Sequence, residues 1–264
     1  MAKKQTLFID AHSHIADPRF NDSAIVEIVN AFQYNRIEFT FVNGGNVYDN
    51  QRTLALKQAL PDKVEIAIGI HPEAIKTGQE WLTVEPMLNS DVKAIGEIGL
   101  DYYYDDAPDR QIQLSSFENQ VILALKHNLP VVVHIRDKEN SDLAYQDAFE
   151  ILEKYKPRFM LHTYAGSVEW AHKFIKLNGY ISFSGTITFG SNRTARDVAK
   201  IVPLERILTE TDAPYLRPHP YINEINEPNT VIYTAYYLCG LLGLGMDKFV
   251  SRVNKNIKEF LNIK

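Results

Sequence analysis

Eight short apolar runs, separated by amphipathic stretches along the whole chain, are the feature that most constrains its fold. Short runs rich in Val and Ile are typical of strands that are buried on both faces of a parallel sheet. The runs predict strands at Thr6–Ala11, Ile37–Asn43, Val64–Gly69, Lys93–Glu97, Pro130–His134, Phe159–His162, Tyr180–Ser184 and Arg206–Thr211. Helical patterns predict helices at Ser23–Asn35, Asn50–Leu60, Asp109–His127, Ser141–Tyr155, Ser167–Leu177, Thr194–Ile201, Thr230–Leu242 and Met246–Leu261.

Eight strands, each followed by a helix, indicate an α/β fold of the (β/α)8 TIM barrel type, built as a single domain over residues 1–264. Parallel strands in one sheet are almost always joined by right-handed crossovers, which suits this alternation. A chain of 264 residues with 45% hydrophobic residues is large enough to bury the core of such a barrel. The alternative is an open doubly wound sheet, which would bind a ligand where the strand order reverses. Residues from many strands converge less easily there, so the barrel is favoured.

Cysteine content and the lack of long apolar runs indicate a cytoplasmic protein. Cys239 is the single cysteine, so no intrachain disulfide can form and a reducing compartment is expected. Met1–Gln5 leads directly into the first predicted strand, without the apolar segment of a secretory signal. No apolar run approaches the roughly 20 residues that span a bilayer, so we expect no membrane association. The net charge of −5 offers no general attraction for nucleic acid, although bound dications would add positive charge locally.

Imidazole and carboxylate side chains stand where the apolar runs end. Active sites of β/α barrels lie at the C-terminal ends of the strands, so these side chains are expected at one rim. The first run carries a His-x-His pair, whose members project to the same face of a strand because they are two residues apart. The residues at the run ends are His12, His14, Glu97, His134, His162 and Asp212.

This donor set is suited to divalent metal ions. A carboxylate can bridge two cations, whereas an imidazole offers one lone pair to one metal. Glu97 among these histidines therefore indicates two ions about 3.5–4 Å apart, and Asp212 could bind the first ion and accept a proton from its water. The alternative is that the histidines are hydrogen-bonded core residues and that Glu97 forms a local ion pair. Asp10 lies deeper and is expected to be structural, while Glu210 would share the face of Asp212 in a regular strand and stays unassigned.

Several motifs stand in a fixed order along nearly the whole chain. They are Phe8-Ile9-Asp10-Ala11-His12-Ser13-His14, Gly69-Ile70-His71-Pro72, Gly96-Glu97-Ile98-Gly99-Leu100-Asp101-Tyr102-Tyr103, His134-Ile135-Arg136-Asp137, His162 with Ala165-Gly166, Gly185-Thr186-Ile187-Thr188, Glu210-Thr211-Asp212-Ala213-Pro214-Tyr215-Leu216 and Asn226-Glu227-Pro228. Together they make the chain resemble the TatD-related deoxyribonucleases of the amidohydrolase superfamily.

The resemblance implies a TIM barrel with a two-metal site that hydrolyses phosphodiester bonds of DNA, often from an end. It implies DNA or a short nucleic acid as the substrate, and no obligate protein partner is expected. Mg²⁺ or Mn²⁺ would support activity and Zn²⁺ is sometimes bound, while mixed His and carboxylate ligation suits Zn²⁺, Mn²⁺ or Fe²⁺ better than Mg²⁺. Asp212 and Glu97 would be the catalytic residues. By motif match, one ion would be held by His12, His14, Glu97 and Asp212, and the second by Glu97, His134 and His162.

Two further residues are candidates for binding the substrate. Arg136 could hold a phosphate oxygen through its fork of donors, or form a salt bridge with Asp137 or Asp101. His71 could contact the substrate or donate to the leaving group; otherwise it is a loop histidine. Three tyrosines that follow Glu97 could stack on a base or pack as part of the rim, and they are Tyr102, Tyr103 and Tyr104.

The chain departs from the family pattern outside the expected metal ligands. Glu73 stands where many members carry another histidine, and Thr163-Tyr164 replaces a frequent Cys-Phe. The segment 221–225 lacks the basic residues that often precede the Asn226 motif, which weakens the case for a long nucleic-acid footprint. Three functions stay open: a nuclease, a hydrolase of an ester, amide or aminoacyl-tRNA bond on the same metals, and a non-catalytic barrel. The complete ligand set argues against the third.

Overall fold

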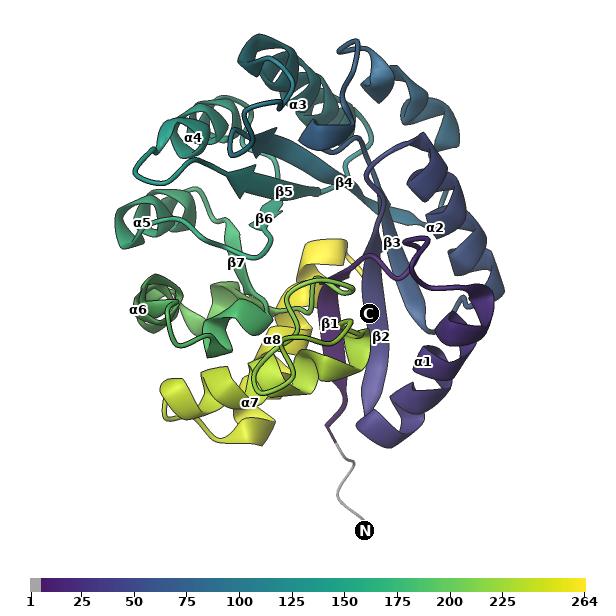
Figure 1. Cartoon of the computed structure of the whole chain (residues 1–264), viewed down its shortest axis with the longest axis vertical. Coiled ribbons are helices and arrows are strands. Elements are labelled where there is room, and N and C mark those ends of the chain that lie inside the picture. The colour runs from purple at the N-terminus through teal and green to yellow at the C-terminus, as the bar shows by residue number, and fades with distance from the viewer. Residues whose placement is uncertain (1–5) are drawn as a thin grey trace.

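The protein forms a parallel barrel, described in a computed structural model for residues 6–264. Over these residues, eight parallel strands are hydrogen-bonded in chain order from β1 to β8, and helices surround them (Figure 1). A further parallel bridge between Ser13 and Ala213 joins β1 to the segment after β8. The predicted TIM barrel is confirmed, and the open doubly wound sheet is excluded because the strand order never reverses.

Strands and helices alternate along the chain. The strands are β1 (Phe8–Ser13), β2 (Ile37–Asn43), β3 (Val64–Ile68), β4 (Val92–Asp101), β5 (Val131–Arg136), β6 (Phe159–Leu161), β7 (Tyr180–Phe183) and β8 (Ile207–Thr209). The α-helices are α1 (Asp22–Asn35), α2 (Val47–Ala59), α3 (Arg110–Lys126), α4 (Leu143–Tyr155), α5 (Val168–Lys176), α6 (Arg193–Ile201), α7 (Val231–Leu241) and α8 (Met246–Leu261). Among residues 6–264, no helix combines the length and the apolar character that crossing a membrane requires.

Three strands run longer than predicted. β1, β4 and β5 end at Ser13, Asp101 and Arg136, and the pairing of β4 with β5 continues to those last residues. The predicted strands stopped where the apolar runs stop, but a polar residue can occupy a strand when it faces a shared site. Three of the candidate residues therefore lie inside strands rather than at or just beyond their last residues: His12, Glu97 and His134.

The prediction that every strand is followed by a helix is wrong at β3. The described stretch 69–91 contains no α-helix and instead has three short 3-10 helices, at Pro72–Ala74, Glu80–Thr83 and Glu85–Met87. Proline occupies the first turn of two of them, and Gly78 has a φ of +81° between them. Proline is tolerated only in the first turn of a helix, and glycine is a poor helix former. A continuous helix is therefore disfavoured here.

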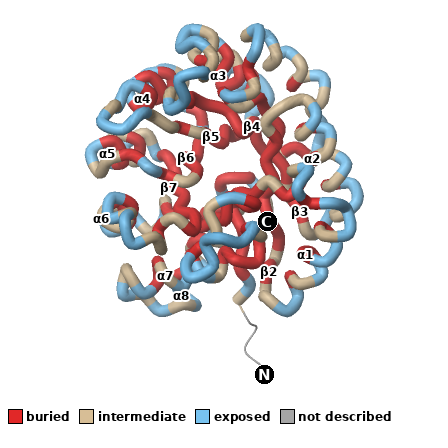
Figure 2. The backbone as a smooth tube through the Cα atoms, in the orientation of Figure 1, coloured by how far each residue is buried: buried red, intermediate tan, exposed pale blue. Residues whose placement is uncertain are grey.

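The last helix closes one end of the barrel. Apolar side chains inside the barrel pack against the end of α8, where Phe260 is fully buried. Their strand residues include Ile9, Phe41, Met160 and Leu208. Figure 2 shows that burial is concentrated along the strands and on the inner sides of the helices. The polar residues of the candidate site therefore lie at the other end of the barrel, at the C-terminal ends of the strands.

Candidate metal centre

The six predicted residues converge at the C-terminal end of the barrel. A cavity of about 690 Å³ opens there, and both His71 and Arg136 line it. His12 is fully buried beneath the cavity, and its Nε2 lies 3.4 Å from Oε2 of Glu97, which lines the cavity. The other predicted residues that line the cavity are His14, Glu97, His134, His162 and Asp212.

Four donor atoms surround a common point on the β1–β8 side of the cavity. His12 Nε2 and His14 Nε2 lie 3.0 Å apart. Glu97 Oε2 lies 3.4 and 3.2 Å from these nitrogens, and Asp212 Oδ1 lies 3.5 and 3.4 Å from them. Ligands at about 2.1 Å from a tetrahedral ion are separated by roughly 3.4 Å. The spacing of these four atoms therefore fits one divalent cation.

A second group of donors lies on the other side of Glu97. His134 Nδ1 and His162 Nε2 are 3.1 Å apart. Glu97 Oε1 lies 3.0 Å from the first and 2.7 Å from the second. Each oxygen of Glu97 thus faces its own pair of imidazole nitrogens, which is the arrangement that a bridging carboxylate requires.

Oxygen acceptors behind two of the histidines, His14 and His134, orient their rings. His14 Nδ1 lies 2.9 Å from the Asn43 carbonyl oxygen, and His134 Nε2 lies 2.9 Å from Asp101 Oδ2. His162 Nδ1 lies 3.5 Å from Glu210 Oε1, which is within ion-pair range, but makes no hydrogen bond. A ring nitrogen that faces an acceptor carries the proton, so the other nitrogen presents its lone pair to the cavity.

The sequence did not identify these acceptors. Asp101 was considered only as a partner of Arg136, because the predicted strand ended at Glu97. β8 ends at Thr209, and Asp212 adopts a left-handed φ of 57°, so Glu210 and Asp212 do not follow the alternation of a regular strand. Glu210 is instead fully buried and accepts a bond from the Thr163 backbone N–H at 2.7 Å. Neither acceptor follows from the apolar pattern, because β4 continues past its predicted end and β8 stops before Glu210.

His71 differs from His14 and His134 because its protonated ring nitrogen is the one that faces the centre. Its Nδ1 accepts a bond from the Glu73 backbone N–H at 3.2 Å, so the ring proton is on Nε2. That nitrogen lies 3.4 Å from Glu97 Oε1. Burial lowers the pKa of His71. The neutral ring therefore directs an N–H donor, rather than a lone pair, toward the centre.

Charges in the cavity are strongly coupled. Burial alone would raise the pKa of Glu97, but the imidazoles around it, His162 first among them, hold it well below its usual range. Burial alone would lower the pKa of His14, but its bonds to Asp212 and Glu97 raise it to about 10. The pKa of His162 is also raised against the effect of burial, chiefly by Glu97. The ionised carboxylates favour positive charge here, as a cation site requires.

Glycines beside Glu97 allow β4 to approach β5 closely. A Cβ on Gly96 would lie 2.6 Å from Val132 Cβ. Gly99 has a φ of +142°, and a Cβ there would collide with the His134 carbonyl oxygen. Both positions need glycine, because a side chain would push apart the two strands that carry Glu97 and His134.

Asp10 lies below the centre and connects two strands with the segment that follows β8. It is fully buried, and its carboxylate accepts bonds at 2.8 Å from Thr40 Oγ1 and from the backbone N–H and Oγ1 of Thr211. Burial is the main reason that its pKa is raised to about 8. These contacts link β1 to β2 and to the segment after β8, which agrees with the structural role expected for Asp10.

Arg136 forms neither of the salt bridges considered for it. Over residues 6–264, no carboxylate of Asp101 or Asp137 is ion-paired with its guanidinium, which lies 3.8 Å from the ring centroid of Tyr103. Tyr102 faces inward instead, donating its hydroxyl to Asp147 at 2.9 Å. The three consecutive tyrosines therefore divide between core packing and the cavity rim.

Comparisons with known proteins agree with this architecture. The sequence profile of the family described as "TatD related DNase" matches residues 9–262. The chain is 32% identical over 264 residues to the "Uncharacterized metal-dependent hydrolase YabD" of Bacillus subtilis, covering 97% of this chain and 100% of the relative. It is 34% identical over 207 residues to the "Uncharacterized metal-dependent hydrolase YcfH" of Escherichia coli K12, covering 76% and 75%. The crystal structure of YJJV, a TatD homologue from E. coli K12, has a TM-score of 0.87 at 26% identity, over 97% of this chain and 98% of that chain. The chain therefore belongs to the TatD related DNase family.

Proposed function

We propose that the protein is a metal-dependent phosphodiesterase that cleaves DNA from a strand end with two divalent cations, Zn²⁺, Mn²⁺ or Mg²⁺. The observation that carries the proposal is the position of Glu97, whose two oxygens face two separate histidine pairs. Family membership and the names of the relatives, which are metal-dependent hydrolases, support it. One ion would be held by His12, His14, Glu97 and Asp212, and the other by Glu97, His134 and His162.

The chemistry divides between the cations and the residues around them. When bound, the cations supply positive charge to a phosphate and lower the pKa of water toward neutrality. Burial alone would raise the pKa of Asp212, but its bond with His14 brings it below the usual value. Asp212 is therefore an ionised carboxylate that can orient the attacking water and accept its proton. His71 can donate its Nε2–H to a phosphate oxygen or to the leaving oxygen. Arg136 lines the same cavity but does not contact the donor atoms of the centre.

A cleavage assay tests this function. End-labelled single-stranded DNA is expected to be shortened by protein loaded with Mg²⁺, Mn²⁺ or Zn²⁺. Asp212→Asn is expected to lower kcat by about 10²–10⁴-fold, because the variant lacks the proton acceptor. Asp62→Asn is the matched control, because Asp62 is an exposed carboxylate in the turn before β3, and it should leave kcat unchanged. Intact DNA with all three metals would contradict the proposal.

A second candidate is a hydrolase of carboxylic esters or amides, including aminoacyl-tRNA linkages. The cavity wall favours it in one respect, because Asp17, Asp49 and Glu73 line the same cavity and would repel a polyanion. Turnover of an ester, amide or aminoacyl-tRNA panel by the metal-loaded protein, with DNA left intact, would select this function.

A further inference from the structure

Two exposed tyrosines and an arginine form a rim that the proposed chemistry leaves unexplained. We define the β4–β5 rim as Tyr103, Tyr104 and Arg136. Tyr103 and Tyr104 are 45% and 44% exposed, and their rings meet at 89° with centroids 4.9 Å apart. Tyr104 and Arg136 line the cavity that contains the candidate metal centre. Rings this exposed add little to the core, so packing does not account for them.

Arg136 is held in place by tyrosines, without an ion pair to a carboxylate among the described residues. Its guanidinium carbon lies 3.8 Å from the Tyr103 centroid and 5.0 Å from the Tyr104 centroid. One guanidinium nitrogen donates to Tyr104 Oη at 3.0 Å. Within the part of the chain that the structure describes, no carboxylate is ion-paired with Arg136. A guanidinium has five N–H donors, so this one offers further donors and a positive charge at the cavity mouth.

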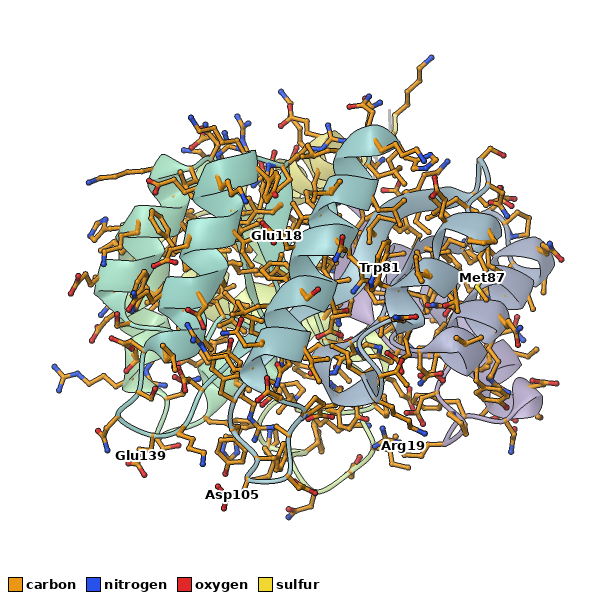
Figure 3. The ribbon with its side chains drawn as sticks, turned by 90° about the horizontal axis from the view of Figure 1, so that it is seen from above. Arg19, Trp81, Met87, Asp105, Glu118 and Glu139 are labelled. Atoms are coloured by element: carbon orange, nitrogen blue, oxygen red, sulfur yellow. The ribbon has the colours of Figure 1, made fainter. Side chains whose placement is uncertain are left out.

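The opposite rim contains a similar pair whose charge is neutralised. Arg19 lies over the ring of Tyr215 at 4.2 Å, but Asp17 binds its guanidinium through both oxygens at 2.9 and 2.8 Å. Asp49 lines the same wall of the cavity. Figure 3 labels Arg19 and, well separated from it along the same edge of the molecule, Asp105, which follows Tyr104. The cavity mouth is therefore polarised, with its available cation on the β4–β5 rim.

We propose that the β4–β5 rim is a nucleotide subsite that holds the nucleotide next to the bond being cleaved. Its phosphate would bind Arg136, and its base would stack on Tyr104. This inference rests on the proposed phosphodiesterase function. It adds the direction in which the nucleic-acid strand extends from the candidate metal centre, toward β4 and β5. Arginine forks suit phosphates, and stacking on tyrosine accepts any base, so the subsite takes a single-stranded nucleic acid without sequence preference.

The position of Arg136 separates this phosphate from the one under attack. Arg136 follows His134 by two residues in β5, and a strand rises about 3.3 Å per residue, so its Cα is roughly 7 Å further along the strand. Its side chain contacts Tyr103 and Tyr104, not the carboxylates of the centre. A phosphate on Arg136 is therefore a neighbour of the scissile phosphate.

Two substrates distinguish the subsite from the catalytic centre. Methyl p-nitrophenyl phosphate has one diester and no nucleoside, whereas trithymidylate also offers a neighbouring phosphate and bases. Arg136→Met is expected to lower kcat/KM for trithymidylate about tenfold or more, with less than a twofold change for the simple diester. Tyr104→Leu is expected to raise KM for trithymidylate about tenfold, but not for a trimer that lacks the stacked base. Arg19→Met is the matched control. It should leave the ratio of the kcat/KM values for the two substrates unchanged, because Asp17 already neutralises Arg19.

Binding without turnover separates failure of the subsite from failure of the proposed function. Labelled trithymidylate is titrated into chelator-treated protein and followed by fluorescence anisotropy, and Arg136→Met is expected to raise Kd about tenfold. If the wild type cleaves no phosphodiester, the proposed function is wrong and this Kd alone decides the subsite. If Arg136→Met leaves Kd unchanged and lowers the turnover of both substrates equally, the subsite is wrong and the phosphodiesterase function stands.

Discussion

Asp101 shows at the scale of one residue how the candidate centre depends on groups that hold no metal themselves. Its Oδ2 lies 2.9 Å from His134 Nε2, and the residue is 1% exposed. Burial alone would raise the pKa of Asp101, but the bond from His134 brings it below its usual value, so it is ionised. Asp101→Asn removes that negative charge and is expected to weaken metal affinity about 10–100-fold, measured by titration against a fluorescent chelator.

Asp147→Asn is the matched control for this experiment. Asp147 is also buried, on α4, but it binds Arg110 and Tyr102 and touches no candidate ligand. The variant should lose stability and keep the metal affinity of the wild type. Equal affinities for Asp101→Asn and the wild type would mean that the carboxylate does not orient His134.

At the scale of elements, the connection after β3 is held together by one carboxylate. Glu80 accepts backbone N–H bonds from Lys76, Thr77 and Gly78 at 2.8–3.1 Å. Burial alone would raise its pKa, but these bonds, Thr77 first, lower it to about 2. A pKa below the unfolded value stabilises the fold above that value, and the stabilisation is lost as the pH falls toward 2.

Glu80→Gln tests this contribution. The variant is expected to lower the free energy of unfolding at pH 7 by about 1–3 kcal/mol, because it replaces a charged acceptor by a neutral one. The difference from the wild type should shrink as the pH falls from 5 toward 2. Urea unfolding at several pH values measures it, with Glu153→Gln, on the exposed side of α4, as a control that changes nothing. A difference that stays constant down to pH 3 would contradict the assignment.

The order of strands and helices was predictable from the sequence, but two of the residues around the centre were not. The alternation of apolar runs and helical patterns was enough to predict the barrel, because burial on both faces is a local property of each strand. The candidate site was predictable because polar residues stand at the ends of the apolar runs, and these ends meet at one rim of the barrel. Asp101 and Glu210 were beyond reach, because their roles depend on strands β4 and β8 departing from the apolar pattern. The absence of an α-helix after β3 was not predicted, because residues 69–91 have no clear hydrophobic periodicity.

At the scale of the whole molecule, the barrel separates stability from chemistry. α8 closes one end with Phe260, while the candidate centre lies at the other. Phe260→Ala is expected to lower the free energy of unfolding by about 3–5 kcal/mol, because it leaves a cavity among packed side chains. Ile122→Ala, on an exposed position of α3, should change it by less than about 0.5 kcal/mol. Urea unfolding measures both, and the folded Phe260→Ala protein should bind metal as the wild type does.

The proposed function depends on Glu97 lying between two cation positions. Anomalous diffraction from crystals of the zinc- or manganese-loaded protein tests it most directly. Two peaks about 3.5–4 Å apart are expected, one beside His12, His14 and Asp212 and the other beside His134 and His162, with an oxygen of Glu97 at each. A single peak, or peaks that Glu97 does not contact, would contradict it.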